Sequence, residues 1–355
     1  MKVLTVVGAR PQFIKAAAVS KVLRREADEF LLHTGQHYDD AMSDLFFRQL
    51  GIPDPDLNLA VGSGPHGAQT GAMLAGIEKA IAEQRPDVVL VYGDTNSTLA
   101  GALGAAKCHV PVAHVEAGLR SFDRLMPEEV NRVVADHVAD ILLCPTESAA
   151  KNLADEGIRD GVHVVGDVMY DAFIENSATA RASSDVLARN GLAAGGYQLL
   201  TVHREDNTAT AGNLESILRG VGESGARVVF PAHPRTSALL GATVAVPRNV
   251  KVVEPMGYLD MLVLEDGAEA IVTDSGGVQK EAYFAGRPCI TVRQNTEWTE
   301  TVDAGWNVLV GRDPVAIADA MLHFRPSGPR PSVFGDGHAA ERVVAALKAF
   351  AQRIT

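Results

Sequence analysis

The chain repeats one pattern almost from end to end: a short apolar run, a turn of glycine or polar residues, and then a stretch with helical spacing. Short apolar runs bounded by turn residues are typical of buried strands, and their alternation with helices predicts parallel sheets. The expected strands cover residues 2–7, 29–34, 87–92, 110–115, 140–144, 162–166, 198–202, 227–230, 250–253, 269–273 and 288–292. This pattern predicts an α/β protein built on doubly wound parallel sheets.

The length of 355 residues indicates two domains, because a single hydrophobic core rarely grows beyond about 250–300 residues. Residues 176–196 are rich in Ala, Ser, Asn and Gly, and the strand pattern restarts after them. We therefore expect a Rossmann-like N-terminal domain over residues 1–168, joined by a terminal helix at 338–355, and a second Rossmann-like domain over 169–337. Ligands of such sheets bind outside the carboxyl ends of the strands, so both domains are expected to face a common cleft.

Composition narrows the choice of partners. Hydrophobic residues make up 46% and charged residues 21%, and no apolar run reaches the roughly 18 residues of a membrane span. A net charge of −12 argues against nucleic acid or an anionic membrane as a partner. No signal peptide is recognisable, so a cytoplasmic protein is expected. Cys108, Cys144 and Cys289 match no metal or disulfide spacing, which predicts small core residues.

The stretch VTDSGGVQKEA at residues 272–282 is the clearest candidate binding element. It is expected to be the end of a strand, a turn and the first turns of a helix, with Ser275 as the N-cap. Gly276 and Gly277 let backbone N–H groups approach a ligand, and the positive end of the helix dipole suits a phosphate. Glu281 lies about one helical turn further, where a carboxylate could bind ribose hydroxyls. The alternative is an ordinary strand-to-helix turn with a cap.

Polar side chains follow nearly every expected strand. They are Arg10; Gln36 and His37; Asp94; Glu116 and Arg120; His203 and Arg204; His233 and Arg235; and Ser275 with its two glycines. Any one of them alone is most often a loop residue or a cap. Seven occurrences at equivalent topological positions favour a binding site at the strand ends.

Three carboxylates in the first half are candidates for acid–base chemistry: Asp94, Glu116 and Glu128. Glu128, Asn131 and Arg132 fall on one face of a helix that begins just before them. If that face borders the cleft, neighbouring carboxylates would push one another's pKa values apart and give an acid and a base in one pocket. The alternative is that Glu128 complements the helix dipole and pairs with Arg132.

The second half supplies cations and amides rather than carboxylates. A pyrophosphate could be held by His203, Arg204, Arg235 and the turn at 275–277. The first half would then act on the group attached to the pyrophosphate. This division of roles between the two halves indicates that the substrate is a nucleotide sugar. The sequence has no Walker A lysine motif, no metal cluster at recognisable spacing and no G-x-S-x-G elbow. Acid–base chemistry without a metal or redox cofactor is therefore expected.

Nine short motifs, in the family's order, make the chain resemble the non-hydrolysing UDP-N-acetylglucosamine 2-epimerases. They are GARPQFIK from Gly8, GDTNST from Gly93, HVEAGLRS from His114, MPEEVNR from Met126, PTE from Pro145, GDVMYD from Gly166, TVHREDN from Thr201, PAHPR from Pro231 and TDSGG from Thr273. The resemblance implies a GT-B-type fold of two Rossmann-like domains and a homodimer. It implies anti elimination of UDP across C1–C2 to give 2-acetamidoglucal, followed by re-addition of UDP, without NAD.

The resemblance also implies roles for individual residues. The catalytic group corresponds to Asp94, Glu116, Glu128 and His203. The diphosphate contacts correspond to Arg10, Ser275, Gly276 and Gly277, and the ribose contact to Glu281. The remaining substrate-binding or UDP-binding residues are expected to be Lys15, Arg132, Arg204 and His233.

Two departures from the family pattern matter. Gln12 stands where many members have glutamate. In the regulated bacterial enzymes a QHRQ-like run and a following arginine bind a second, activating UDP-sugar; here those positions hold the run at 36–39 and Ala72, so allosteric activation is not expected.

Two alternative activities remain open at this point. The segment SFDRLMPEEVNR is more similar to the branch that epimerises UDP-2,3-diacetamido-2,3-dideoxyglucuronic acid. A GT-B glycosyltransferase would share the fold and the DSGG turn, but it would also need an acceptor site.

Overall fold

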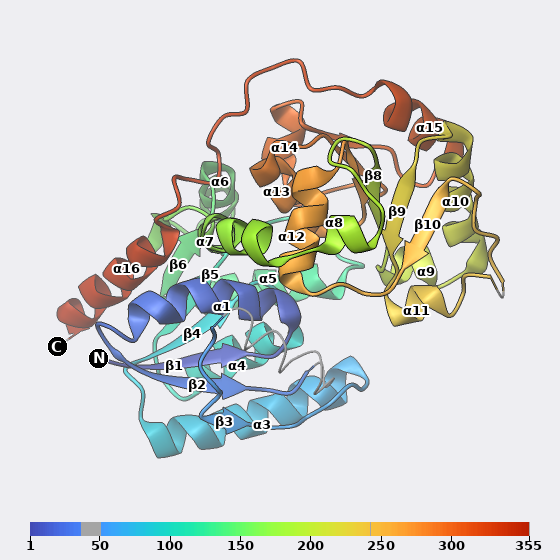
Figure 1. Cartoon of the computed structure of the whole chain (residues 1–355). Coiled ribbons are helices and arrows are strands. Elements are labelled where there is room, and N and C mark those ends of the chain that lie inside the picture. The colour runs from blue at the N-terminus through green and yellow to red at the C-terminus, as the bar shows by residue number, and fades with distance from the viewer. Residues whose placement is uncertain (37–50, 242, 355) are drawn as a thin grey trace. The chain divides into compact units, whose positions relative to one another are not determined.

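The computed structural model describes residues 1–36, 51–241 and 243–354. Contacts divide the chain into an N-terminal unit, residues 1–174 with 332–355, and a C-terminal unit, residues 175–331. Each unit holds one parallel sheet with helices packed on it (Figure 1), which confirms the predicted α/β fold class. The helix expected near residues 40–50 and the run from His37 to Asp39 lie outside the described residues.

The sheet of the N-terminal unit has the strand order β3-β2-β1-β4-β5-β6-β7. Its strands are β1 (Lys2–Val7), β2 (Asp28–His33), β3 (Leu57–Asn58), β4 (Val88–Tyr92), β5 (Val112–Val115), β6 (Ile141–Cys144) and β7 (Val162–Val164). Its helices are α1 (Arg10–Leu23), α3 (His66–Gln84), α4 (Asn96–Lys107), α5 (Pro127–Val138), α6 (Glu147–Asp155) and α16 (Ala339–Ile354), and α7 (Val168–Ser183) contains the boundary between the units.

Register in this sheet brings two predicted site residues close together. Tyr92 at the end of β4 pairs with Val115 at the end of β5, so Asp94 and Glu116 follow neighbouring strand ends. The Ala- and Gly-rich helix α4 packs tightly on β4, because a Cβ added at Gly101 would lie only 2.7 Å from a methyl carbon of Val91. A larger residue at this position would push the helix away from the strand that carries the Asp94 turn.

The C-terminal helix α16 belongs to the N-terminal unit. It packs against α1 and β6, and Figure 1 shows α16 in red beside α1 in blue. Val343, Val344 and Leu347 are buried at helical spacing, which is the apolar stripe expected of a helix that lies on a core.

The C-terminal unit has a second sheet in the order β10-β9-β8-β11-β12-β13. Its strands are β8 (Gln198–Thr201), β9 (Val228–Pro231), β10 (Val250–Val253), β11 (Ile271–Thr273), β12 (Cys289–Thr291) and β13 (Asn307–Leu309). Its helices are α8 (Val186–Arg189), α9 (Glu205–Thr208), α10 (Ala211–Ser224), α11 (Pro234–Ser237), α12 (Tyr258–Gly267), α13 (Gly276–Ala285), α14 (Thr299–Asp303) and α15 (Pro314–His323).

Register again explains which polar residues meet in this unit. Thr201 at the end of β8 pairs with Thr273 at the end of β11, and their hydroxyl oxygens lie 2.6 Å apart. His203 and Asp274 therefore follow adjacent strand ends. The short strands β3 and β13 were not predicted, because two or three residues carry too little apolar pattern to be told from a loop.

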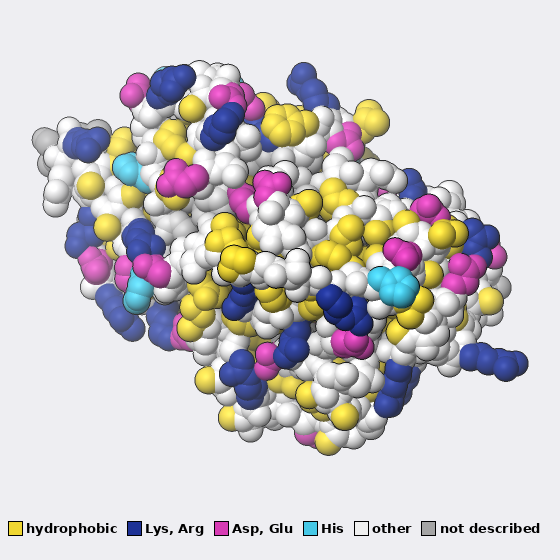
Figure 2. All heavy atoms as spheres, turned by 90° about the horizontal axis from the view of Figure 1, so that it is seen from above, with side chains coloured by type: hydrophobic (Ala, Val, Ile, Leu, Met, Phe, Trp, Pro, Cys, Tyr) yellow, Lys and Arg dark blue, Asp and Glu magenta, His cyan; other side chains and the backbone are white. Residues whose placement is uncertain are grey.

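The surface agrees with the mixed charge of the sequence. On the face shown in Figure 2, acidic and basic side chains are interspersed with apolar and uncharged ones. Throughout the described part of the chain, every helix falls short of the length and apolarity needed to span a bilayer.

Candidate active site

Glu116 and Lys15 form a buried ion pair in the N-terminal unit. Lys15 projects from α1, and Glu116 follows β5 directly with its backbone in the left-handed region (φ 71°). Non-glycine residues in that region are strained, and such strain is concentrated at functional sites. Both side chains are less than a tenth exposed, so each charge depends on the other.

Gly93 brings Asp94 next to this pair. Its φ is +61°, and a Cβ at this position would lie 3.0 Å from Lys15 Nζ and 3.2 Å from Glu116 Oε2. Only glycine fits both the conformation and the space. The predicted neighbours Asp94 and Glu116 are therefore close together because the turn after β4 runs against the ion pair.

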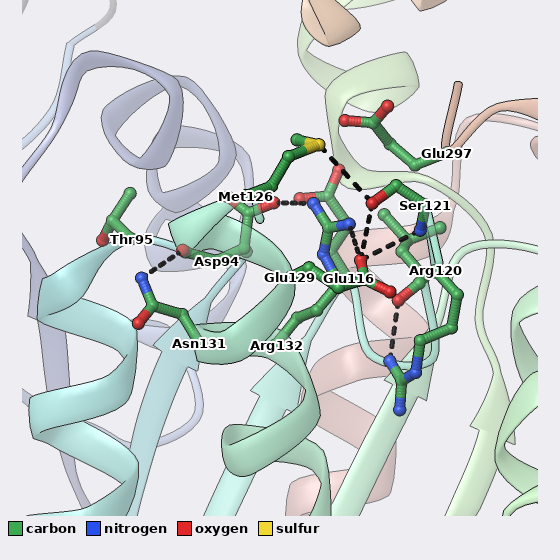
Figure 3. Close-up of polar contacts among 12 residues, drawn as sticks. Asp94, Thr95, Glu116, Arg120, Ser121, Met126, Glu129, Asn131, Arg132 and Glu297 are labelled. Carbon is green, nitrogen blue, oxygen red and sulfur yellow. Dashed lines mark hydrogen bonds and ion pairs between the residues drawn. The ribbon is translucent and has the colours of Figure 1, made fainter. Parts of the chain in front are cut away.

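Arg132 connects Asp94 to a second carboxylate. Its guanidinium is 2% exposed, forms an ion pair with Asp94, and donates to Glu129 Oε2 at 2.6 Å; Figure 3 shows it between the two acids. Glu129 also accepts from Ser121 N, Ser121 Oγ and Phe122 N, each at 2.9 Å. Burial acts to raise the pKa of Glu129, but these hydrogen bonds and the charge of Arg132 outweigh it and lower the pKa.

The alternative interpretation paired Arg132 with Glu128, whereas the structure pairs Arg132 with Asp94 and with Glu129, the residue next to Glu128. In α5 the arginine side chain reaches back three residues to Glu129, which is buried, whereas Glu128 is half-buried in the first turn. Of the three residues expected to share one face of this helix, Asn131 and Arg132 are both buried.

In the C-terminal unit Asp274 organises the turn after β8. Its buried carboxylate accepts from the backbone N–H of His203 at 3.1 Å and of Arg204 at 3.0 Å, and from Asn207 Nδ2 at 3.0 Å. The Nδ1 atom of His203 lies 3.4 Å from Asp274 Oδ1, while the imidazole itself is about half exposed. A carboxylate at Nδ1 orients the ring and leaves Nε2 for other partners.

The turn at 275–277 is an N-terminal cap, as predicted. Ser275 Oγ accepts from Val278 N, and Gly276 and Gly277 begin α13. A Cβ at Gly276 would lie 3.3 Å from Trp298 Nε1 and 3.4 Å from Glu297 Oε1, so any larger residue would crowd this helix terminus. Glu281 is buried on the same helix.

The remaining predicted site residues lie at strand ends of their own units. Arg204 Nη2 lies 3.4 Å from Glu297 Oε1, whose other oxygen is 2.8 Å from Arg293 Nη1. His233 follows β9 and is exposed. Arg10 and Arg235 have described backbones, at the starts of α1 and α11, but their side chains lie outside the described atoms.

Among the buried acids that the sequence analysis missed, four contact predicted site residues. They are Glu129, Asp136, Asp274 and Glu297. A signal was present for the first two, because residues 129, 132 and 136 lie at i, i+3 and i+7 on one helix face with alternating charge. Asp274 stands inside the TDSGG motif, where only the serine and glycines were considered.

Comparisons with known proteins agree with this geometry. Residues 21–348 match the model of the family described as UDP-N-acetylglucosamine 2-epimerase. A UDP-N-acetylglucosamine 2-epimerase homolog of Methanococcus maripaludis is 49% identical, over 98% of this chain and 99% of its own. The UDP-2,3-diacetamido-2,3-dideoxy-D-glucuronate 2-epimerase of Pseudomonas aeruginosa is 47% identical, over 97% and 98%.

A solved structure shows the same fold. The UDP-GlcNAc 2-epimerase of Methanocaldococcus jannaschii, in complex with UDP-GlcNAc and UDP, superposes with a TM-score of 0.91 at 42% identity, covering 98% of this chain and all of that one.

Proposed function

Because the chain belongs to the UDP-N-acetylglucosamine 2-epimerase family, we propose that it interconverts UDP-N-acetylglucosamine and UDP-N-acetylmannosamine without net hydrolysis. The observation that carries the proposal is a match over nearly the whole chain to relatives named for this activity. The buried carboxylates paired with cations in the N-terminal unit supply the acid–base groups that such a reaction needs.

The proposed reaction has two balanced steps. A base removes the proton from C2 of the sugar while the C1–O bond breaks, which gives 2-acetamidoglucal and UDP. A UDP oxygen then attacks C1, and an acid returns a proton to C2 from the opposite face. The protein supplies the base, the acid and a site that retains UDP between the steps.

Within this scheme the acid–base roles fall to groups at strand ends. Asp94 and Glu116 are supported by their closeness across Gly93, and His203 by the carboxylate of Asp274 at its Nδ1 atom. Glu128 is assigned with them because it lies in the first turn of α5, the helix that also carries Arg132. We assign the sugar chemistry to residues 1–168 with 338–355.

Binding of UDP is assigned to residues 169–337, together with Arg10. The helix N-terminus at 275–277 suits the diphosphate, since it presents backbone N–H groups with the helix dipole behind them. The proposed binding residues are Arg10, Lys15, Arg132, Arg204, His233, Ser275, Gly276, Gly277 and Glu281.

A second substrate is favoured by one observation, the 47% identity to the epimerase of the diacetamido uronic acid nucleotide. Proton NMR in heavy water separates the two substrates. The purified protein is incubated with UDP-N-acetylglucosamine and, in a parallel run, with UDP-2,3-diacetamido-2,3-dideoxyglucuronic acid. The manno epimer should appear with deuterium at C2 and without accumulating UDP, and the faster substrate identifies the branch.

Three other outcomes of that experiment change the proposal. Accumulation of UDP with free sugar would indicate hydrolysis. Epimerisation without deuterium at C2 would contradict proton exchange at that carbon. No change in either compound would return attention to a glycosyltransferase and to a screen of acceptors.

We further propose that the protein is a homodimer, as the family resemblance implies, and that it works in the cytoplasm. Sedimentation velocity should give a species of about twice the 37.6 kDa chain mass. A monomer at micromolar concentration would contradict this.

A further inference from the structure

Three consecutive carbonyls at the end of β4 each accept a hydrogen bond from a buried side chain on another element. The donors are Gln12 Nε2 to Tyr92 O at 2.8 Å, His114 Nε2 to Gly93 O at 2.7 Å, and Asn131 Nδ2 to Asp94 O at 2.9 Å. The middle contact matters most, because Gly93 has the widest conformational freedom of the three residues. The turn that presents Asp94 is thus held through its backbone.

The His114 side chain can make its contacts in only one protonation state. It is completely buried in β5, and its Nδ1 atom lies 2.7 Å from Asp136 Oδ1 while its Nε2 atom lies 2.7 Å from Gly93 O. A carboxylate and a carbonyl are both acceptors, whereas a neutral imidazole has one donor and one acceptor nitrogen. Both contacts are satisfied when the ring is an imidazolium.

The surroundings of Asp136 keep that carboxylate ionised. Its Oδ2 atom accepts from Arg120 Nη1 at 2.6 Å and from Gly118 N at 3.1 Å. Burial acts to raise the pKa of Asp136, but the hydrogen bond and charge of His114 and those of Arg120 outweigh it and lower the pKa. Arg120 also binds Glu156 through two contacts, at 2.6 and 2.8 Å.

The charges of the neighbouring side chains also indicate that His114 is an imidazolium. With Arg120 positive and both Asp136 and Glu156 negative, a neutral His114 would leave the cluster with one uncompensated negative charge. Glu156 is 29% exposed and can be solvated by water, but Asp136 is completely buried and shares Arg120 with it, so the part of that excess on Asp136 would be costly. An imidazolium makes the cluster neutral.

We propose that His114 is a positioning residue: held as an imidazolium by Asp136, it donates to the Gly93 carbonyl and fixes the turn that presents Asp94. The acid–base role of Asp94 rests on the proposed function. His114 itself lies under the turn and acts through Gly93.

Two variants of His114 separate the effect of its hydrogen bond to the Gly93 carbonyl from the effect of its positive charge. In His114→Gln the longer side chain places its amide near the position of Nε2, so it can still donate to Gly93 O. In His114→Asn the amide lies near the position of Nδ1 and faces Asp136 instead. Both variants lose the positive charge of His114 and leave Asp136 with Arg120 as its remaining cation, which matches them for that loss.

The turnover number of the two variants should differ. We expect kcat for epimerisation to fall about 100-fold in His114→Asn, the loss expected for a misplaced catalytic group, and about tenfold or less in His114→Gln. The Kd of UDP should stay within about twofold of wild type in both, because the contact lies in the N-terminal unit beneath the Asp94 turn. Equal kcat values, or a loss confined to KM, would overturn the proposal.

A measurement on the wild-type protein keeps the proposal testable even if a variant does not fold. With ¹⁵N-labelled histidine, the ring of His114 should show protons on both nitrogens in the folded protein, as its two contacts to acceptors require. A single protonated nitrogen would overturn the proposal. This result does not depend on turnover, so a wild-type protein that leaves every UDP-sugar unchanged would contradict the proposed function and not the state of His114.

Discussion

Replacing Arg132 with methionine tests how the carboxylates of the N-terminal unit are held. Methionine keeps much of the apolar stem and removes the guanidinium that pairs with Asp94 and Glu129. Asp94 is 31% exposed and can be solvated by water, whereas Glu129 is 3% exposed and cannot. The cost therefore comes mainly from Glu129.

The expected loss of stability in Arg132→Met is about 3 kcal/mol, the lower end of the range of about 3–5 kcal/mol for removing one partner of a buried pair. The lower end applies because Glu129 keeps three hydrogen bonds from Ser121 and Phe122. The loss should depend on pH. A lowered pKa means that Glu129 contributes stability above its unfolded pKa, and that this contribution disappears as pH falls through its folded pKa.

Urea unfolding followed by far-UV circular dichroism at pH 7 and pH 4 measures both effects. The difference between wild type and Arg132→Met should be large at pH 7 and should shrink at pH 4, because Glu129 without the guanidinium takes up its proton at a higher pH in the variant than in wild type. Lys151→Met is the matched control. It removes the exposed partner of Asp155 in the same unit, and should cost less than about 1 kcal/mol at both pH values.

Two results would refute the reasoning. One is a loss in Arg132→Met no larger than in the control. The other is a loss that is the same at pH 4 as at pH 7, which would mean that Glu129 does not feel the guanidinium.

Three further predictions follow from the site and the core. Asp94→Asn should lower kcat by at least about 100-fold while UDP binding stays measurable by calorimetry, and full activity would remove Asp94 from the acid–base group. Gly276→Ala should weaken UDP about tenfold by narrowing the helix terminus, whereas Gly212→Ala, which has open space around its Cβ, should leave affinity unchanged; equal affinities would contradict a diphosphate at this turn. Burial raises the pKa of Cys144, and that of Cys289 to about 12, so neither thiol should react with a disulfide reagent at pH 8 until denaturant is added.

Most of the fold could be predicted from the sequence because local pattern and tertiary structure agree. Each strongly apolar run, such as residues 87–92 and 198–202, is buried on both faces of a parallel sheet and so has no competing conformation. Element ends shifted by one or two residues, and the strands at 57–58 and 307–309 were missed. These are edge strands, whose short pairing is decided by the neighbouring strand rather than by their own side chains.

The candidate site was less predictable, for a physical reason. The strand-end rule located Asp94, Glu116 and the 275–277 turn, because a parallel sheet fixes where strand ends lie. Pairing between side chains depends instead on rotamer and reach. The ion pair between Arg132 and Glu129, at i and i+3, could not be told from sequence spacing, because Glu128 at i+4 was an equally plausible partner.

The measurement that tests the central claim most directly is positional isotope exchange in UDP-N-acetylglucosamine labelled with ¹⁸O at the oxygen bridging C1 and the diphosphate. Elimination and re-addition release this oxygen to the β-phosphate, so the label should move into its nonbridging positions while the manno epimer forms. A label that stays in the bridge through many turnovers of epimerisation would contradict the account.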